Sequence, residues 1–292
     1  MSVSLSLIAA TAVLAIGRTS PSRAAFCTAA AATTAASSSA PISEYKIQLY
    51  QYKICPFCNR VKSYLDYLQI EYDTIEVNPL SKGEISKLEV KAKKVPIAVI
   101  NGAVIEDSKT IIDFVSNSMV DSASNTRLNF NKQKFFPEDT EKWIEWSEKS
   151  LAVLLYPNIT RSFNESWECF TYANDVVTWN VLTRMAVQYA GAAAMSMANG
   201  KIKKKYNIID ERKDLQECIA TWTTALGSNT FLHGDYITLP DLVVFGVLKS
   251  IAGLSTFREI MTENEKLRVW YECVDKATPS CEGSSSFKLE KK

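Results

Sequence analysis

The sequence predicts an α/β domain of residues 44–119 followed by an all-α domain of residues 137–277. Within the first range, β-prone runs alternate with segments of helical periodicity. From Pro137 onward no strand pattern persists, and helical periodicity continues to about residue 277. A chain of 292 residues has room for two domains of ordinary size and a separate terminal segment.

The charge and cysteine content exclude several classes of protein. Basic residues number 33 and acidic residues 32, so bulk electrostatics does not recruit nucleic acid, and we expect no such partner. The 7 cysteines are spread without the framework of a disulfide-stapled secreted protein. His233 is the only histidine and falls in a predicted turn, so the sequence offers no Cys/His or Ser/His nucleophilic pair.

Residues 1–43 have the composition of a targeting segment. No Asp or Glu precedes Glu44, whereas Arg18, Arg23, many Ser and Thr and a long alanine tract are present, as in organellar transit peptides. The apolar residues 5–17 are too few to span a bilayer, which needs roughly twenty, although they also suit a signal-peptide core. We therefore exclude residues 1–43 from the fold as a targeting or disordered segment. We expect a mitochondrial, plastid or membrane-associated protein.

Strand and helix signals alternate through the α/β domain. The predicted elements are a strand at 46–52, a helix at 56–69, a strand at 71–77, a short helix at 81–90, a strand at 94–100, a strand after it and a helix from 108. Ser81 and Glu84 fit a capping box for the short helix. Asn101-Gly102 is a strong hairpin signal, so the last two strands are antiparallel. Asp107 or Ser108 caps the final helix.

The motif Cys55-Pro56-Phe57-Cys58 carries the chemistry predicted for this domain. Cys55 should lie at the start of a helix, where unpaired N–H groups and the macrodipole favour a nucleophilic thiolate. A zinc site would need four ligands, which the scattered remaining cysteines do not supply, so we expect no metal. A two-residue spacer at a helix start also favours reactive chemistry over a structural disulfide. The motif therefore indicates a redox-type or glutathione-handling thiol, without distinguishing the two.

The second domain is predicted to be entirely helical. Residues 120–136, rich in Asp, Ser, Asn, Thr and Lys, are assigned as a linker. Helical stretches are expected at residues 138–156, 160–173, 175–199, 207–227, 240–253 and 264–277. Thr238 and Asp241 form a capping box before an apolar run, which is a folding signal rather than a site. Residues 278–292 are predicted to be a disordered tail.

The order β-α-β-α-β-β-α with these motifs resembles a thioredoxin/glutaredoxin-like, glutathione-binding domain. The resemblance implies that the bond before Pro96 is cis, an uncommon feature that marks a deliberate turn. The N–H and C=O of Val95 would then pair with the cysteinyl backbone of glutathione like an added strand. The helix that starts at Asp107-Ser108 would receive the γ-glutamyl carboxylate.

A glutaredoxin-like domain followed by an all-α domain is the glutathione S-transferase architecture. Within it, the chain resembles the family of membrane-associated prostaglandin E synthase type 2, over roughly residues 44–277. The similar segments are residues 50–58, 76–79, 94–97, 107–108, 156–161, 191–195 and 239–248. The expected fold is therefore a thioredoxin/glutaredoxin-like N-terminal domain with a helical, GST-like C-terminal domain.

This resemblance implies an isomerase that converts the lipid endoperoxide prostaglandin H2 to prostaglandin E2. The implied catalytic residues are Cys55, Tyr52, Phe57 and Cys58, and the implied glutathione-binding residues are Val95, Pro96, Asp107 and Ser108. Tyr52 would donate a hydrogen bond to an oxygen that develops charge, and Phe57 would supply an apolar wall. Haem as a second cofactor, peripheral membrane association and a homodimer are implied as well.

Two other functions stay open at this point. A glutathione-dependent thiol oxidoreductase or transferase would act on a different substrate and would need Cys58 for dithiol reduction. A non-enzymatic glutathione- and haem-binding protein would need neither thiol for turnover. The chain also departs from the family, which tends to carry a histidine shortly before Pro157-Asn158, where this sequence has Val153. A histidine near the pocket is therefore not expected.

Overall fold

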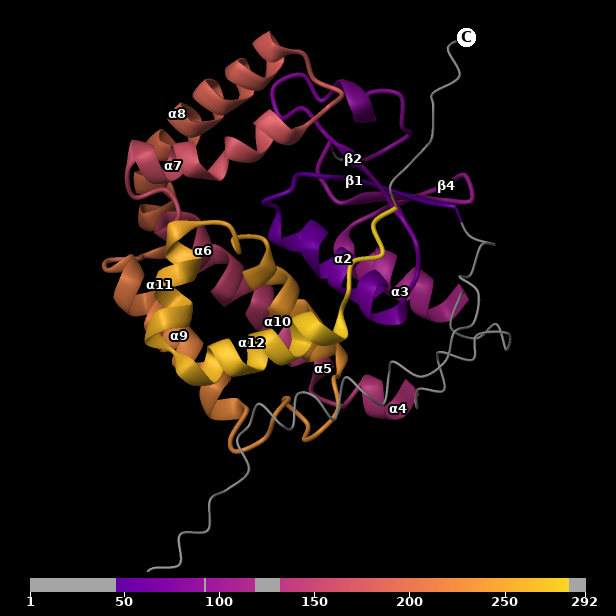
Figure 1. The fold of residues 1–292 in the computed structure, drawn as a ribbon, viewed down its shortest axis with the longest axis vertical. Helices are drawn as coiled ribbons and strands as arrows, with labels where there is room; N and C mark the ends of the chain where they lie inside the picture. The colour runs from indigo at the N-terminus through magenta and orange to yellow at the C-terminus, as the bar shows by residue number, and fades with distance from the viewer. Residues whose placement is uncertain (1–45, 92, 119–131, 284–292) are drawn as a thin grey trace, which may run out of the picture.

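The computed structural model describes residues 46–91, 93–118 and 132–283. The predicted targeting segment, most of the predicted linker and the end of the predicted tail lie outside these residues. The described chain forms the two predicted parts, a small sheet with two helices and a larger group of helices (Figure 1). The predicted fold class, an α/β domain followed by an all-α domain, is therefore confirmed.

The sheet has four strands in the order β2-β1-β3-β4. The strands are β1 (Ile47–Gln51), β2 (Asp73–Glu76), β3 (Ile97–Ile100) and β4 (Ala103–Glu106). β1 and β2 are parallel, and the other two pairs are antiparallel. Asn101 and Gly102 both have positive φ, +49° and +88°, as the predicted tight hairpin turn between β3 and β4 requires.

Helices α2 (Pro56–Leu68) and α3 (Ser108–Ser118) pack together beside the sheet (Figure 1). The short helix expected at residues 81–90 is instead a single 3₁₀ turn, Gly83–Ile85. The predicted capping box does not form, because the Glu84 carboxylate accepts the backbone N–H of Asn78 at 2.9 Å. Without that cap, the segment has too few helical bonds to extend.

The second domain is helical throughout its described residues. Its helices are α4 (Lys132–Phe135), α5 (Thr140–Trp146), α6 (Ala152–Asn158), α7 (Phe163–Cys169), α8 (Val181–Tyr206), α9 (Glu211–Ala225), α10 (Leu239–Lys249), α11 (Ser255–Glu263) and α12 (Glu265–Ala277). A π-helical turn, Ser147–Leu151, joins α5 to α6, and a 3₁₀ segment labelled η4, Thr171–Asp175, follows α7. α8 begins at Val181 rather than near residue 175, because the Asn180 side chain caps it by accepting the Thr183 N–H at 2.8 Å.

The two domains meet where α10 crosses α2. Every residue of α10 from Leu239 to Leu248 is buried. A Cβ on Gly246 would lie 2.6 Å from the Arg60 Cα, so only glycine permits this approach of the two backbones. Arg60 is fully buried at the same contact, and its guanidinium pairs with Glu148 at 2.6 Å. Helix α10 thus holds α2, and with it the Cys55 motif, against the helical domain.

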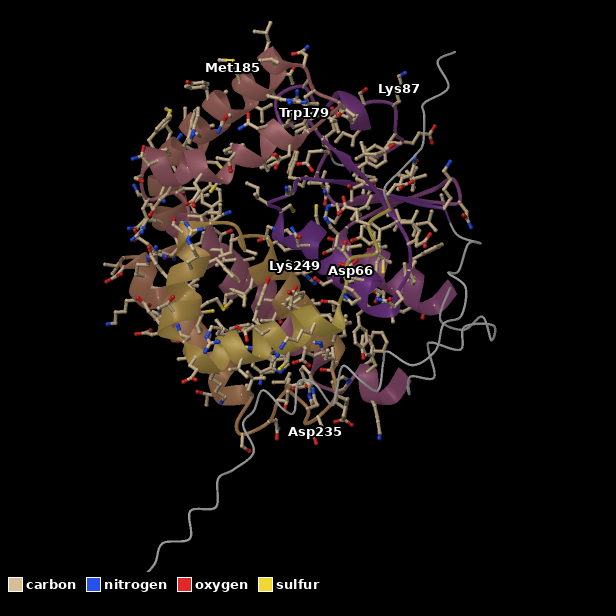
Figure 2. All side chains as sticks on the ribbon, viewed as in Figure 1. Asp66, Lys87, Trp179, Met185, Asp235 and Lys249 are labelled. Carbon is tan, nitrogen blue, oxygen red and sulfur yellow. The ribbon has the colours of Figure 1, made fainter. Side chains whose placement is uncertain are left out.

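Residues 278–283 differ from the disordered tail predicted for this end of the chain. The Gly283 N–H donates to the Tyr72 carbonyl at 2.8 Å, and Glu282 pairs with Lys62 at 2.8 Å. The buried Asp66 carboxylate accepts the Cys281 N–H at 2.8 Å. These partners lie more than two hundred residues earlier in the sequence, so local composition did not reveal them. Figure 2 shows Asp66 close to Lys249 of α10, with which it pairs at 3.7 Å.

No helix among the described residues has the length and apolar character needed to cross a bilayer. The long helix α8 is exposed along part of its length, and Figure 2 shows Met185 on its outer side. Its small residue Gly191 faces Phe170, whose ring would lie 2.5 Å from an added Cβ. The alanine-rich part of α8 therefore serves close packing within the domain.

Candidate active site at one end of the sheet

The strand register brings the predicted site residues to one end of the sheet. Gln51, the last residue of β1, pairs with Glu76, the last residue of the parallel strand β2. Tyr50 pairs with Ile97 at the start of β3, and Ile97 pairs with Glu106 at the end of β4. The segments that continue beyond these residues therefore emerge side by side: the Cys55 loop after β1, Val95-Pro96 before β3, and Asp107-Ser108 after β4.

Cys55 is the N-cap residue of α2, with extended backbone angles. Its N–H donates to the Tyr52 carbonyl at 2.9 Å, which closes the turn between β1 and α2. The Asn59 side chain donates to the carbonyls of Lys53 and Cys55 at 2.8 and 2.9 Å and fixes the same turn from inside. Pro56 occupies the first helical position, where no partner for a backbone N–H is needed. The turn is therefore held by hydrogen bonds on both sides of the sulfur.

The two thiols of the motif have opposite electrostatic surroundings. A hydrogen bond from the Cys58 thiol lowers the pKa of Cys55, and the backbone N–H groups of Cys58 and Phe57 add to this against the effect of burial. Burial raises the pKa of Cys58 well above its ordinary value. Cys55 is half-buried and Cys58 is fully buried. The pair therefore has one thiol suited to ionise and a neighbour suited to donate a hydrogen bond to it.

Tyr52 and Phe57 flank the dithiol on different sides. Tyr52 is half-buried against the small apolar cluster of Val77, Ile85 and Ile97, which Val95 also contacts. Burial, and secondarily the charge of Cys55, raises the pKa of Tyr52 to about 12, so the phenol keeps its proton at neutral pH. The half-buried ring of Phe57 lies 5.8 Å from the Arg60 guanidinium, on the side of the helical domain.

The peptide bond between Val95 and Pro96 is cis, as the sequence resemblance implied. Within the part of the chain that the structure describes, the backbone N–H and C=O of Val95 make no hydrogen bond. Pro96 is buried, whereas Val95 is half-buried beside Tyr52. An extended peptide could therefore pair with Val95 in the manner of an added strand.

Asp107 and Ser108 form the start of α3, next to the same sheet end. Asp107 has φ of +75°, and its carboxylate accepts the N–H groups of Lys109 and Thr110 at 2.9 and 3.4 Å. The residue thus caps α3, as the sequence predicted. Its carboxylate already occupies two of the helix N–H groups, so a ligand carboxylate at this end would be left with the amide and hydroxyl of the buried Ser108.

Glu76 is a site residue that the sequence reasoning missed. Its carboxylate accepts the Lys53 N–H at 2.8 Å. The side chains of Gln51 and, from the helical domain, Tyr172 of η4 interact with the same carboxylate. Burial raises the pKa of Glu76 to about 7. The signal was an acid at the penultimate position of the β-prone run 71–77, which lies parallel to the strand that leads into Cys55.

The comparisons with known proteins identify the family of the chain. Residues 49–119 match the family described as "Glutathione S-transferase, N-terminal domain". The chain is 32% identical to Prostaglandin E synthase 2 of Danio rerio over 274 residues, covering 81% of this chain and 72% of that protein. The corresponding protein of Mus musculus is 28% identical, with 80% and 70% covered. The chain belongs to the prostaglandin E synthase 2 family.

Solved structures with a similar course of the chain are glutathione transferases. Glutathione S-transferase III in apo form covers 78% of this chain and 91% of its own, with a TM-score of 0.48 and 16% identity. Glutathione transferase Omega 3C from Trametes versicolor covers 88% and 91%, with a TM-score of 0.49 and 13% identity.

The described chain offers no free histidine to the haem that the resemblance implies. His233 binds the Thr238 hydroxyl with one ring nitrogen at 3.2 Å and the Asp139 carboxylate with the other at 2.9 Å. Both nitrogens are therefore used within the helical domain. Within the described ranges, no group of three or more His, Cys, Asp or Glu side chains is arranged to hold a metal. The residues present do not offer a histidine ligand to haem iron, and we derive no step through haem.

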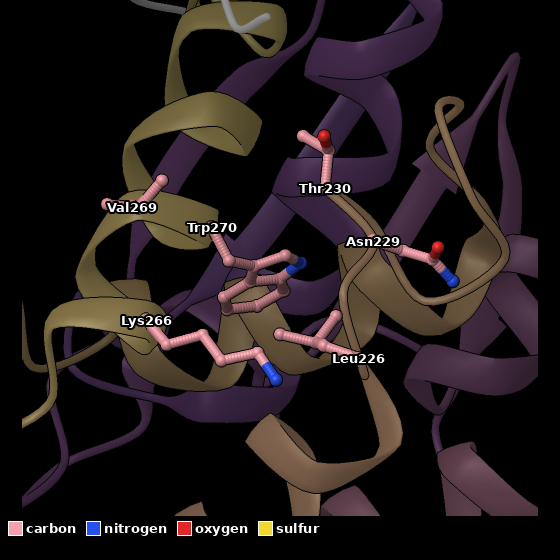
Figure 3. Close-up of a pocket in the computed structure, with 6 residues that line it drawn as sticks. All are labelled: Leu226, Asn229, Thr230, Lys266, Val269 and Trp270. Atoms are coloured by element: carbon pink, nitrogen blue, oxygen red, sulfur yellow. The ribbon is translucent and has the colours of Figure 1, made fainter. Parts of the chain in front are cut away.

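A small pocket lies in the helical domain rather than beside Cys55. Figure 3 shows its lining residues, which come from the end of α9, the loop after it and α12. Its volume is about 10 Å³, which is room for about one water molecule. The Trp270 ring forms one wall of it. A pocket of this size does not hold a lipid. The candidate active site is therefore the Cys55 end of the sheet.

Proposed function

We propose that this protein is a prostaglandin E synthase-type isomerase that converts prostaglandin H2 to prostaglandin E2 with the Cys55 thiolate, in the presence of glutathione. The observation that carries the proposal is the half-buried Cys55 thiol, whose pKa is lowered by the hydrogen bond from Cys58 at the start of α2. Membership of the prostaglandin E synthase 2 family supports the choice of substrate.

The proposed reaction leaves the oxidation level of the enzyme unchanged. The Cys55 thiolate attacks one endoperoxide oxygen, the weak O–O bond breaks, and its electron pair goes to the second oxygen, which takes the Tyr52 proton. The Tyr52 phenolate then removes the hydrogen from the carbon that carries the sulfur-bound oxygen. The C–H electron pair forms the ketone, the S–O bond breaks, and its electron pair restores the Cys55 thiolate. The product is a hydroxy ketone, and both residues are regenerated.

Tyr52 is suited to this role because it stays protonated at neutral pH. Its pKa of about 12 makes it a hydrogen-bond donor in the resting site. A phenolate formed beside the sulfur would be a strong base, which favours removal of the second proton. Phe57 offers an apolar ring on the side that faces the helical domain, where a fatty chain would lie.

Glutathione fits the backbone next to the dithiol. Its cysteinyl backbone would pair with Val95 before the cis bond, and its γ-glutamyl carboxylate would meet the Ser108 amide and hydroxyl. When bound, glutathione supplies a third thiol beside Cys55 and Cys58. The two segments that would hold it, before β3 and after β4, are brought to one sheet end by the strand register.

The test is turnover of prostaglandin H2 beside reduction of glutathione disulfide, for the wild type, Cys55→Ser and Cys58→Ser. We expect Cys55→Ser to lower both rates at least about 100-fold, because it removes the nucleophile. Cys58→Ser should abolish dithiol reduction while leaving most of the isomerisation. Wild-type isomerase activity in Cys55→Ser would disprove the proposal.

A second candidate function is a glutathione-linked thiol oxidoreductase. It is favoured by one observation, the interaction between the Cys58 and Cys55 thiols, which makes the two free cysteines neighbours in one dithiol motif. Disulfide reduction without turnover of the endoperoxide would select this function. Haem binding, homodimer formation, peripheral membrane association and residence in a mitochondrion or plastid stay predictions from the resemblance and from residues 1–43.

A further inference from the structure

We propose that Glu76 controls the ionisation of Cys55, because its carboxyl group lies at the same sheet end and is tied both to the Cys55 loop and to the helical domain. In this role Glu76 is a positioning residue rather than one that touches the substrate. Its negative charge opposes the Cys55 thiolate, and uptake of a proton by Glu76 releases that opposition. The inference deepens the proposed function, on which it rests for the role of Cys55.

The first tie joins Glu76 to the active-site loop. Glu76 ends β2 and pairs with Gln51, the residue that ends β1. Its carboxylate accepts the N–H of Lys53 at 2.8 Å, two residues before Cys55 in the chain. The Gln51 side chain interacts with the same carboxylate and acts to lower its pKa. The loop that places the sulfur is therefore anchored on this acid.

The second tie joins Glu76 to the helical domain. The phenol of the buried Tyr172 of η4 interacts with the Glu76 carboxylate, whose charge, after burial, raises the pKa of Tyr172. The next turn of the same segment carries Asp175, which pairs with the Lys53 ammonium at 3.5 Å. Two contacts from η4 thus converge on Glu76 and on the residue that it anchors. A change at Glu76 should therefore affect contacts both in the Cys55 loop and in the helical domain.

The cations near Glu76 are shared with other acids. Lys53 pairs with Asp175, and Lys62 of α2 pairs with Glu282 at 2.8 Å. The titratable groups that act on Glu76 or on the dithiol are Lys53, Tyr52, Cys55, Cys58, Lys62 and Tyr172, with Glu84 acting on Tyr52. Burial prevails over the hydrogen bonds and these cations and raises the pKa of Glu76 to about 7. The acid therefore changes charge near neutral pH.

When the charged forms of two acidic groups repel each other, the ionisation of one group raises the pKa of the other. The charge of Glu76 raises the pKa of Cys55, against the hydrogen bonds that lower it. Below the pKa of Glu76 the carboxyl group is neutral and does not oppose formation of the Cys55 thiolate. Above that pKa the carboxylate is charged and makes ionisation of Cys55 less favourable. The ionisation of Cys55 should consequently spread over a wider pH range than that of a single independent group.

The experiment follows the rate of Cys55 alkylation by iodoacetamide from pH 4 to 10 on the full chain, with the labelled peptide identified by mass spectrometry. We compare the wild type with Glu76→Gln, which keeps an oxygen to accept the Lys53 N–H and removes the charge. We expect a broad curve for the wild type. For Glu76→Gln we expect a single-proton curve that coincides with the wild type on the acidic limb and completes its rise at lower pH, with about three- to tenfold faster alkylation just above pH 7, where the wild-type carboxyl is charged.

Glu84→Gln is the matched control, because Glu84 also accepts a backbone N–H, that of Asn78 at 2.9 Å, in the neighbouring 3₁₀ turn. Its alkylation curve should coincide with the wild type. A second variant, Tyr172→Phe, removes the phenol whose interaction favours the ionised Glu76 carboxyl and should move the broad part of the curve to higher pH. This variant tests the inference even where Glu76→Gln folds poorly.

The outcomes separate this inference from the proposed function. Identical curves for the wild type, Glu76→Gln and Tyr172→Phe, with Cys55 ionising below an ordinary thiol, would overturn the role of Glu76 alone. A Cys55 that titrates as an ordinary thiol in every variant would overturn the proposed function itself. A narrower curve in Glu76→Gln, together with the shift in Tyr172→Phe, supports the inference.

Discussion

Each domain contains an acidic residue withdrawn from solvent, and the two differ in their partners. Asp241 of α10 is fully buried, and each of its oxygens accepts two hydrogen bonds. The donors are the N–H of Leu232 at 3.0 Å, the N–H and hydroxyl of Thr238 at 3.0 and 2.8 Å and the indole N–H of Trp270 at 3.0 Å. Glu76 accepts fewer hydrogen bonds, and its neighbours are two thiols and a phenol.

The comparison teaches that burial alone does not assign a role to an acid. Burial raises the pKa of both carboxyls, but at Asp241 four hydrogen bonds act against it. Those donors come from the start of α10, the preceding loop and α12, so Asp241 joins three parts of one core. At Glu76 the partners belong to the reactive loop and to the neighbouring domain. The first acid organises the fold, and the second, in the role that we propose, responds to pH beside Cys55.

The largest effect that would test this contrast is expected for Asp241→Asn. The new NH₂ group would face donors that now bind a carboxylate oxygen, and at least one of them would be left buried without a partner. We expect the free energy of unfolding to fall by about 3–4 kcal/mol. Urea unfolding at pH 7 measures this change, and Asp235→Asn, on the exposed loop labelled in Figure 2, is the control. A loss below about 1 kcal/mol would contradict the structural role.

The same two acids show how much of the structure could be predicted from the sequence. The capping box at Thr238 and Asp241 was predictable, because both residues lie within one turn of one helix. Its link to Trp270 was not, because that residue follows 29 positions later on a different helix. Cys55 and the Asp107 cap were predicted from local motifs, and the cis bond before Pro96 was predicted from the family resemblance. Glu76 escaped because its role depends on the parallel register with β1 and on Tyr172, neither of which a single sequence reveals.

The second prediction concerns the helix that connects the two regions, since α10 carries Asp241 and crosses α2 below Cys55. In Gly246→Ala, the added methyl would lie 2.6–2.7 Å from the backbone of Arg60 and Asn59, so the helices must separate. We expect the free energy of unfolding to fall by about 2–3 kcal/mol. Gly200→Ala, at an exposed helical glycine with no atom near its Cβ, is the matched control and should be neutral or slightly stabilising.

The Gly246→Ala variant also tests whether the packing of α10 on α2 affects the ionisation of Cys55. The groups that lower the pKa of Cys55 belong to the first turn of α2, before the crossing point at Asn59 and Arg60. The alkylation curve of Cys55 in the folded variant should therefore keep the wild-type shape. A curve shifted by more than about one pH unit would show that the two regions are not independent.

The smallest expected effect is a pH-dependent one at Glu76. The pKa of Glu76 is about 7 in the folded protein and lies above its ordinary value of 4.5, so the folded state binds this proton more tightly. Its contribution to stability is fully present below pH 4.5 and is lost as the pH rises to 7. Glu76→Gln has no such titration. The variant should therefore gain stability relative to the wild type, by about 2 kcal/mol, between pH 4.5 and pH 8.

Thermal and urea unfolding of both proteins across this pH range measure the difference directly. Replacing the carboxyl by an amide should change the free energy of unfolding in opposite directions at the two acids. Asp241→Asn removes an oxygen that accepts hydrogen bonds from buried donors, whereas Glu76→Gln removes a charge that burial disfavours at neutral pH. A Glu76→Gln variant that is destabilised equally at pH 4.5 and pH 8 would place Glu76 with Asp241 as a structural acid. A gain confined to the higher pH requires a carboxyl group that ionises inside the folded protein, next to the loop that holds Cys55.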